Sequence, residues 1–331
     1  MSIVSKYITY IRNIRRYSER TAQIYAGVLR DFVLFVCDGD VAPSDSLILD
    51  SLKPQLIRTY EVSLLDSDPP KTPRTVNLHL SVLSGFCRFL IKEGFLKSNP
   101  VSLVARPKSE SRLPVFYKKE AMEDYFEKTK YYASPEELVA FEQDWDTPNG
   151  KKSYEKRLAR TIISTLYGLG LRRSEVIGMN VGSVDFGRKV VKVEGKGNKM
   201  REIPLVDSLS EEILLYLKAV EVICGGQRSL KEPLFITYTG RRLYPAYVDQ
   251  VVKSELDGVK DLTGRKSPHV LRHSLATELM NEEADLHSVK ELLGHSSLAA
   301  TQVYTHSSIA RLKDIYKQAH PRAKNGGKNG D

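Results

Sequence analysis

Long apolar runs are absent from this sequence, and cysteine is scarce. No window approaches the roughly 20 apolar residues of a membrane-spanning helix, so we expect no transmembrane segment. The start of the chain carries scattered charges and no uninterrupted apolar stretch, so we expect no signal peptide. The three cysteines, Cys37, Cys87 and Cys224, are odd in number and far apart, which favours reduced thiols over disulfides or a metal site. These absences predict a cytoplasmic protein.

The chain has an excess of positive charge. Its 331 residues include 50 lysines and arginines against 41 aspartates and glutamates, which gives a net charge of +9. The excess is shared by both halves of the sequence and is not confined to a tail. It favours a polyanionic partner, which is either nucleic acid or a membrane surface. The length suits two domains better than a single core.

The first 105 or so residues have the pattern of four helices and no strong strand. In the stretch 72–94, Thr72 suits an N-cap, Pro73 the first helical position and Gly94 the C-terminal stop. Its expected buried face consists of Val76, Leu80, Leu83, Cys87 and Leu90. An earlier helix is expected over 18–36. Its expected apolar face consists of Ile24, Val28, Phe32 and Phe35.

The stretch 99–116 has prolines, serines and charges without periodicity, which is typical of a linker. We therefore expect a helical N-terminal domain at 1–106, a linker at 107–114, a second domain at 115–320 and a polar, disordered tail at 321–331.

The second domain is expected to be mainly helical, with one small β element. The sequence alternates in the manner of strands on both sides of residues 195–198, which predicts a hairpin. Helices are expected over 118–131 and before residue 170, whereas 133–157 has no clear assignment. The predicted fold class is mainly α with a small β-hairpin: an all-helical N-terminal domain followed by an α+β domain.

Tyr304 raises the question of whether a tyrosine acts as a nucleophile. In "LGHSSLAATQVYTH", His295 lies nine residues before it and His306 two residues after it. Most tyrosines pack an apolar ring and leave the hydroxyl at a boundary, and this chain has 17 tyrosines. This segment alone does not separate a packing residue from a catalytic one.

His269 and His273 are spaced to share a helix face, which is a spacing found in zinc sites. The segment "HVLRH" contains no glutamate, and Arg272 would bring positive charge beside an ion. We therefore expect no metal there. By themselves, Arg172 and Lys196 are equally compatible with solvated surface residues.

Four segments of the sequence indicate a function only in combination. They are "LYGLGLRRSE", "VEGKGNKMREIPL", "SPHVLRHSLAT" and "LLGHSSLAATQVYTH". In order and wording they resemble the signature segments of tyrosine site-specific recombinases, a phage-integrase family, and the Xer type most closely. The N-terminal helices and "NPVSLVARPK" also resemble that group's core-binding domain and linker. The resemblance covers nearly the whole chain and implies that 115–320 is the catalytic domain.

The resemblance implies a set of catalytic residues that works without a metal or other cofactor. The set is Arg172, Lys196, His269, Arg272, His295 and Tyr304. Glu175 is implied to support the site, and His273, which is not a member of the set, is expected to be structural.

The implied reaction is DNA strand cleavage by transesterification. Tyr304 attacks the scissile phosphate and gives a 3′-phosphotyrosine and a free 5′-hydroxyl, which preserves the energy of the bond for rejoining. The two arginines and His295 hold the phosphate oxygens. Lys196 protonates the leaving oxygen, and His269 accepts the tyrosine proton or helps to hold the phosphate.

Two features depart from the family pattern. About twenty residues at 133–152 are extra relative to shorter Xer proteins, and they would form an extra helix or a contact loop. Glu278 stands where the family more often has histidine, outside its catalytic set, so we expect little consequence.

The implied partner is double-stranded DNA and not a membrane, with the two domains closing around the duplex as a clamp. A homo- or hetero-tetramer on DNA is expected, with a second recombinase and a DNA translocase as further partners. A helix after Tyr304 would dock on a neighbouring protomer or pack on its own domain. Its apolar face is Ile309, Leu312, Ile315 and Ala319.

The first functional hypothesis is resolution of chromosome or plasmid dimers, in support of chromosome partition at cell division. The second is integration or inversion of a mobile element by the same chemistry. A catalytically silent architectural DNA-binding protein and a type IB topoisomerase remain as alternatives. All six catalytic positions are filled, which disfavours the silent protein, and the Xer-like N-terminal segments disfavour the topoisomerase.

Overall fold

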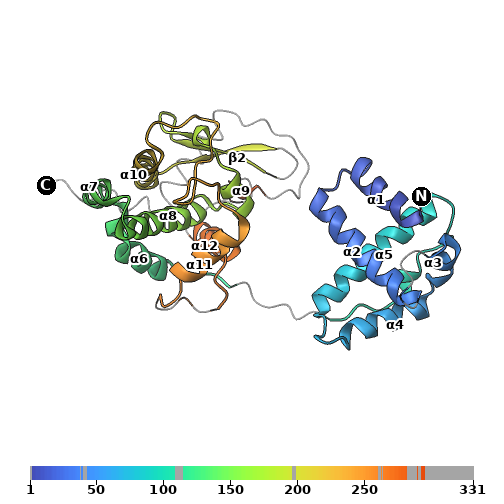
Figure 1. Cartoon of the computed structure of the whole chain (residues 1–331). Helices are drawn as coiled ribbons and strands as arrows, with labels where there is room; N and C mark the ends of the chain where they lie inside the picture. Colours follow the sequence, from blue (N-terminus) through green and yellow to red (C-terminus); the bar gives the residue numbers. More distant parts are fainter. Residues whose placement is uncertain are drawn as a thin grey trace. The chain divides into compact units, whose positions relative to one another are not determined.

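The chain forms two compact units, Met1–Arg112 and Leu113–Asp331 (Figure 1). The computed structural model describes residues 2–37, 39, 43–108, 115–195, 199–259, 262, 264–281, 289 and 292–294. The units are mainly helical, and the second also contains a small antiparallel sheet, so the predicted fold class is confirmed. Among the described residues, no helix combines the length and the apolar character needed to cross a membrane.

The first unit is built from helices alone in its described part. They are α1 (Ile3–Asn13), α2 (Glu19–Val36), α3 (Asp45–Ser51), α4 (Pro54–Leu65), α5 (Pro73–Lys92) and the 3-10 helix η1 (Pro100–Leu103). The sequence predicted four of these helices, over the first residues, over 18–36, after Pro54 and over 72–94, and therefore missed α3. With seven residues, α3 spans only two turns, which is too short for apolar periodicity to reveal it.

The predicted face of α5 is confirmed, because all five of its apolar positions are buried. Thr72 caps the helix by accepting a hydrogen bond from the Thr75 amide at 3.3 Å, and Gly94 follows with a positive φ of 81°. The prediction for α2 was wrong at Ile24, which is 43% exposed. Each step of four residues turns about 40° past a full helical turn, so a series of such steps leaves the buried face.

The second unit contains the remaining elements. They are α6 (Lys119–Lys128), η2 (Lys130–Ala133), α7 (Pro135–Asp144), α8 (Pro148–Leu169), α9 (Arg173–Gly178), η3 (Val181–Ser183), β1 (Val184–Asp185), β2 (Val190–Glu194), β3 (Met200–Pro204), α10 (Asp207–Cys224), α11 (Pro245–Glu255) and α12 (Pro268–Asn281).

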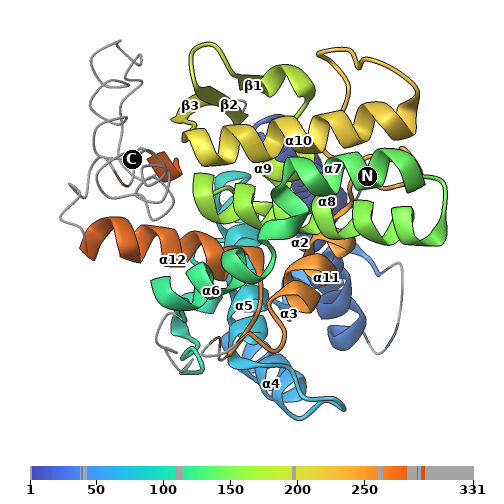
Figure 2. The ribbon, with the colours of Figure 1, turned by 90° about the vertical axis from the view of Figure 1, so that its left-hand side faces the viewer.

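Helix α8 is the centre of the second unit. Every residue from Arg157 to Leu169 is buried, so the C-terminal half of this helix is surrounded on all sides. It contacts α7, α10, α11 and α12, and Figure 2 shows α7, α8 and α10 running side by side. Since α8 leads directly into Arg172, this packing fixes the start of the first signature segment.

Strands β1, β2 and β3 form an antiparallel sheet in that order, which confirms the predicted hairpin. Val191 pairs with Ile203, and Val193 pairs with Arg201. All four of these residues are buried, whereas Lys192 and Glu194 are exposed. An arginine therefore occupies a position on the inward, apolar face of the hairpin.

The segment at 133–152, which we expected to be extra, forms α7 and the beginning of α8, so of the two expected forms it is a helix and not a loop. Ser134 caps α7 and Thr147 caps α8. Glu137 of α7 forms a fully buried ion pair with Arg157 of α8. An unpaired charge at such a depth is costly, and this pair therefore ties the extra helix to the core.

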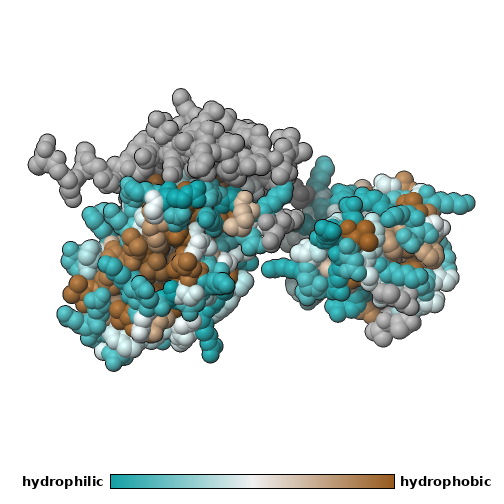
Figure 3. All heavy atoms as spheres, turned by 90° about the horizontal axis from the view of Figure 1, so that it is seen from above, coloured by the Kyte–Doolittle hydropathy of each residue, from teal (hydrophilic) through white to brown (hydrophobic). Residues whose placement is uncertain are grey.

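Some apolar side chains of the second unit remain exposed, among them Val139 of α7, Trp145 just after it and Leu214 of α10. Figure 3 shows a broad apolar area, bordered by hydrophilic residues, on the visible face of this unit. Between η2, α7 and α10 lies a surface cavity of about 440 Å³, lined in part by Lys130, Leu214 and Lys218.

Candidate active site

Arg172 and Glu175 are held by the turn that joins α8 to α9. Gly170 ends α8 in the left-handed conformation, with φ of 58°. A Cβ atom at this glycine would lie 2.7 Å from Cδ2 of Leu293, so the Leu293 side chain packs directly against this turn. Arg172 is the N-cap of α9, and its backbone N–H donates to Oε2 of Glu175 at 2.8 Å. The carboxylate thus closes the first turn of α9.

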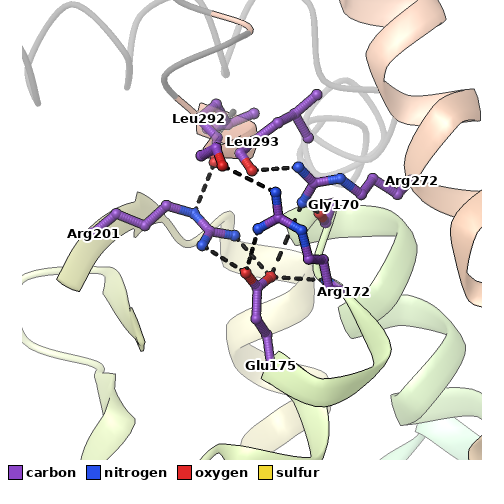
Figure 4. Close-up of polar contacts among 8 residues, drawn as sticks. Gly170, Arg172, Glu175, Arg201, Arg272, Leu292 and Leu293 are labelled. Atoms are coloured by element: carbon purple, nitrogen blue, oxygen red, sulfur yellow. Dashed lines mark hydrogen bonds and ion pairs between the residues drawn. The ribbon is translucent and has the colours of Figure 1, made fainter. Parts of the chain in front are cut away.

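The Glu175 carboxylate is the common acceptor of this region, as Figure 4 shows. Nη1 of Arg172 donates to its Oε1 at 2.7 Å. Arg201 of β3 binds both oxygens, each at 2.9 Å, with two parallel donors. Nη1 of Arg272 on α12 lies 4.0 Å from Oε2. Segments that are far apart in the sequence therefore meet at one carboxylate that is 3% exposed.

The same three arginines hold three consecutive backbone carbonyls (Figure 4). Nε of Arg201 donates to the oxygen of Leu292 at 3.0 Å, Arg272 donates to that of Leu293, and Nη2 of Arg172 donates to that of Gly294 at 2.9 Å. Gly294 is followed directly by His295. The arginines therefore fix the backbone at the start of the fourth signature segment, directly before His295.

Arg272 is almost completely buried, and the exposed fraction of its side chain is only 7%. It also donates to the carbonyl of Gly170 at 2.6 Å, which joins α12 to the end of α8. Burial and then the neighbouring charge of Arg172 lower its pKa to about 10, while Glu175 acts in the opposite direction. Arg272 still carries its charge at neutral pH.

Burial by itself would raise the pKa of Glu175. Hydrogen bonds and positive charge from Arg201, followed by the hydrogen bonds from Arg172, outweigh this effect and lower the pKa below its usual value of 4.5. Glu175 is therefore ionised at neutral pH. Counting one carboxylate against three guanidinium groups, the cluster keeps an excess of two positive charges, which suits an anionic substrate.

His269 lies at the second position of α12, where it is exposed. Its pKa is lowered by partial burial and then by the positive surroundings of His273, Arg272, Arg173 and Arg265. The imidazole is therefore neutral at pH 7 and able to accept a proton. His273, one turn later, is also exposed.

Of the six residues expected to be catalytic, the structure brings Arg172 and Arg272 together and places His269 on the same helix as Arg272. Lys196, His295 and Tyr304 lie outside the described residues. On either side of the undescribed residues 196–198, the Gly195 amide donates to the Lys199 carbonyl at 2.8 Å.

Glu278, the departure from the family pattern, is a buried acceptor between two helices. The hydroxyl of Tyr167 on α8 donates to its Oε2 at 2.5 Å, and Nζ of Lys119 lies 3.9 Å from its Oε1. It therefore links α8 to α12, which carries Arg272.

Arg201 also belongs to this cluster, and it was not predicted from the sequence. Its signal was present in "KMREIPL", where alternation places residue 201 on the same face as Ile203. A charged residue at an inward-facing position requires a buried partner of opposite charge.

Replacement of Glu175 by glutamine is expected to lower the free energy of unfolding by about 3–5 kcal/mol at neutral pH, because it leaves buried guanidinium groups without their carboxylate. The folded-state pKa is depressed, so the carboxylate's contribution is present above its usual pKa of 4.5 and is lost as the pH falls below it. Urea unfolding of both proteins from about pH 7 to about pH 3 should show that the difference between their free energies of unfolding shrinks in that acidic range. A difference that is the same at every pH would contradict this assignment.

Comparisons with known proteins agree with this geometry. Residues 135–311 match the phage integrase family, and residues 4–94 match the phage integrase N-terminal SAM-like domain. Tyrosine recombinase XerC of Chlorobaculum tepidum is 34% identical, with 97% of this chain and 94% of the relative covered. Tyrosine recombinase XerC of Bacillus licheniformis is 32% identical, with 98% of each chain covered.

Among solved structures, the XerH site-specific recombinase bound to palindromic difH substrate has a TM-score of 0.63. It is 18% identical, with 95% of this chain and 84% of that chain covered, and it shows that the fold is shared. The family match over more than half of the sequence, together with XerC relatives at 30% identity or more, shows that the chain belongs to the phage integrase family, as a Xer-type tyrosine recombinase that cleaves and rejoins DNA.

Proposed function

We propose that this enzyme resolves chromosome or plasmid dimers by site-specific recombination, through a 3′-phosphotyrosine and a Holliday junction. The observation that carries the proposal is the meeting of Arg172 and Arg272, from distant segments, at one buried carboxylate. The relatives named XerC support the Xer-like role. The substrate is duplex DNA, in agreement with the palindromic difH substrate that is bound in the XerH structure.

Arg172 and Arg272 would bind the non-bridging oxygens of the scissile phosphate. Among the described residues, each guanidinium donates two of its five N–H groups to protein oxygens, so further donors remain for the phosphate. Arg172 is 31% exposed, which leaves it accessible to substrate. Preorganised donors of this kind stabilise the charge that develops in phosphoryl transfer without the help of a metal ion.

Tyr304 would attack the phosphorus, and the bond to the 5′-oxygen would break. The proton of the tyrosine goes to neutral His269, and the leaving 5′-oxygen takes a proton from Lys196. His295 adds a donor to the phosphate. The reverse reaction, with a 5′-hydroxyl of the partner strand as nucleophile, restores the phosphodiester and releases Tyr304.

The two domains would clamp the duplex from both sides, with lysines and arginines of each contacting phosphates. Four subunits act together on two DNA sites, either as one protein or with a second recombinase, and a DNA translocase activates them. The segment after Tyr304 lies outside the described residues; the helix expected there would join neighbouring subunits through Ile309, Leu312, Ile315 and Ala319. We place the enzyme in the cytoplasm, because its DNA substrate lies there.

A nicked suicide duplex that carries the native site tests the nucleophile. The wild-type protein should form a covalent protein–DNA band on a denaturing gel in the presence of EDTA, and Tyr304→Phe should form none. Tyr244→Phe is the matched control, because this tyrosine is 55% exposed and lies outside the cluster. Adduct formation by Tyr304→Phe would reject the assignment. Bound duplex without any adduct, even when a partner recombinase is added, would favour an architectural protein.

The pH dependence of cleavage tests His269. Its lowered pKa keeps the imidazole neutral above that value, so the rate should fall only as the pH drops through a midpoint below 6.5. In His269→Gln, the rate should be about 100- to 10,000-fold lower, and the acidic limb of the profile should vanish. Single-turnover rates on the suicide duplex provide the measurement. An unchanged acidic limb in the variant would assign that titration to another group.

A further inference from the structure

Arg201 has contacts that a strand arginine does not need for stability alone. Its side chain is 6% exposed and points to the inward face of the hairpin. It supplies two parallel donors to Glu175 and directs Nε to the carbonyl of Leu292. A guanidinium presents donors in a fixed planar fork, whereas a lysine ammonium cannot satisfy both acceptors in this geometry.

Arg201 also packs against the two glycines that precede two of the expected catalytic residues. A Cβ atom at Gly195, just before Lys196, would lie 3.6 Å from its Nη1. A Cβ atom at Gly294, just before His295, would lie 3.3 Å from its Cδ and Nη1. Gly294 has a φ of 63°, a left-handed conformation that favours glycine, and the Arg201 side chain packs tightly against it.

The carboxylate that Arg201 binds is the one that orients Arg172. Figure 4 shows Arg201 reaching Glu175 from β3, while Arg172 approaches it from the start of α9. Displacement of Arg201 would therefore free the base of the hairpin from α9. It would also remove the donor at Leu292, two residues before Gly294.

We propose that Arg201 is a positioning residue, which locks the hairpin that carries Lys196 against the Glu175–Arg172 pair so that the lysine is in place to protonate the leaving oxygen. This inference rests on the proposed cleavage reaction. Arg201 is not among the residues expected to contact the reacting atoms: both of its terminal nitrogens bind Glu175, and its Nε binds the carbonyl of Leu292.

The leaving oxygen provides a specific test. In DNA whose scissile 5′-oxygen is replaced by sulfur, the leaving group is a thiolate, which needs no proton donor because a thiol is far more acidic than a sugar hydroxyl. A defect that arises from a misplaced Lys196 therefore shrinks on the sulfur substrate. A defect that arises from misfolding or from weaker DNA binding is the same on both substrates.

The experiment compares the full-length wild type, Arg201→Gln and Arg188→Gln on oxygen- and sulfur-containing suicide duplexes. Arg188 is the matched control, because it makes the same two-donor contact with a carboxylate of this hairpin, at 3.0 Å to each oxygen of Glu202, but on its exposed side. DNA affinity and urea unfolding are measured for each protein.

Arg201→Gln should cleave the oxygen substrate about 100-fold more slowly than wild type, as expected for the loss of general acid catalysis. Its defect on the sulfur substrate should be at least about tenfold smaller, with DNA affinity within about twofold of wild type. Arg188→Gln should match wild type on both substrates. If Arg201→Gln does not fold, Arg201→Lys, which keeps the charge and loses the fork, should show the same dependence on sulfur.

An equal defect on both substrates, or a wild-type rate on the oxygen substrate, would overturn the positioning role of Arg201. Failure of the wild type itself to form a covalent complex, even with a partner recombinase added, would instead reject the proposed function. The two failures are therefore distinguishable in one experiment.

Discussion

The buried carboxylate of Glu175 is the constraint on which the candidate site depends. It closes the first turn of α9, binds the side chain of Arg172, accepts two donors from Arg201 and faces Arg272. Three guanidinium groups so close together would repel one another, and burial would add to the cost of each charge. One ionised carboxylate offsets part of this repulsion and leaves an excess of positive charge for a phosphate.

The three backbone carbonyls at Leu292, Leu293 and Gly294 complete this arrangement from the other side. On one side, Arg172 and Arg201 bind the Glu175 carboxylate, and Arg272 binds the carbonyl of Gly170. On the other side, each arginine donates to one of the carbonyls of residues 292–294, directly before His295. The donors are thus oriented before substrate binds, which is the condition for electrostatic stabilisation of a transition state. The side chains of Leu293 and Arg201 pack closely against Gly170 and Gly294. The resemblance in sequence and the geometry therefore point to the same chemistry.

Much of the fold could be predicted where the pattern was long and regular. The face of α5 and the hairpin were predicted correctly, because apolar spacing in each is repeated over several residues. The short helix α3 was not predicted, because two turns are too few for a repeated apolar spacing. The position of Ile24 was predicted wrongly, because repeated steps of four residues drift around the helix and leave its buried face. The resemblance identified Arg172, Arg272 and Glu175 but not Arg201, whose importance depends on which segments meet in three dimensions. The catalytic roles of all six residues remain predictions, and Lys196, His295 and Tyr304 also lie outside the described residues.

A double-mutant cycle between Glu175 and Arg201 tests most directly whether the shared carboxylate holds the site together. The free energy of unfolding at neutral pH would be measured for the wild type, Glu175→Gln, Arg201→Gln and the double variant. We expect a coupling energy on the order of 2 kcal/mol, because either single change leaves a buried charge without its partner. Effects that add to within about 0.5 kcal/mol would show that the two residues act independently and that the shared carboxylate does not hold the site together.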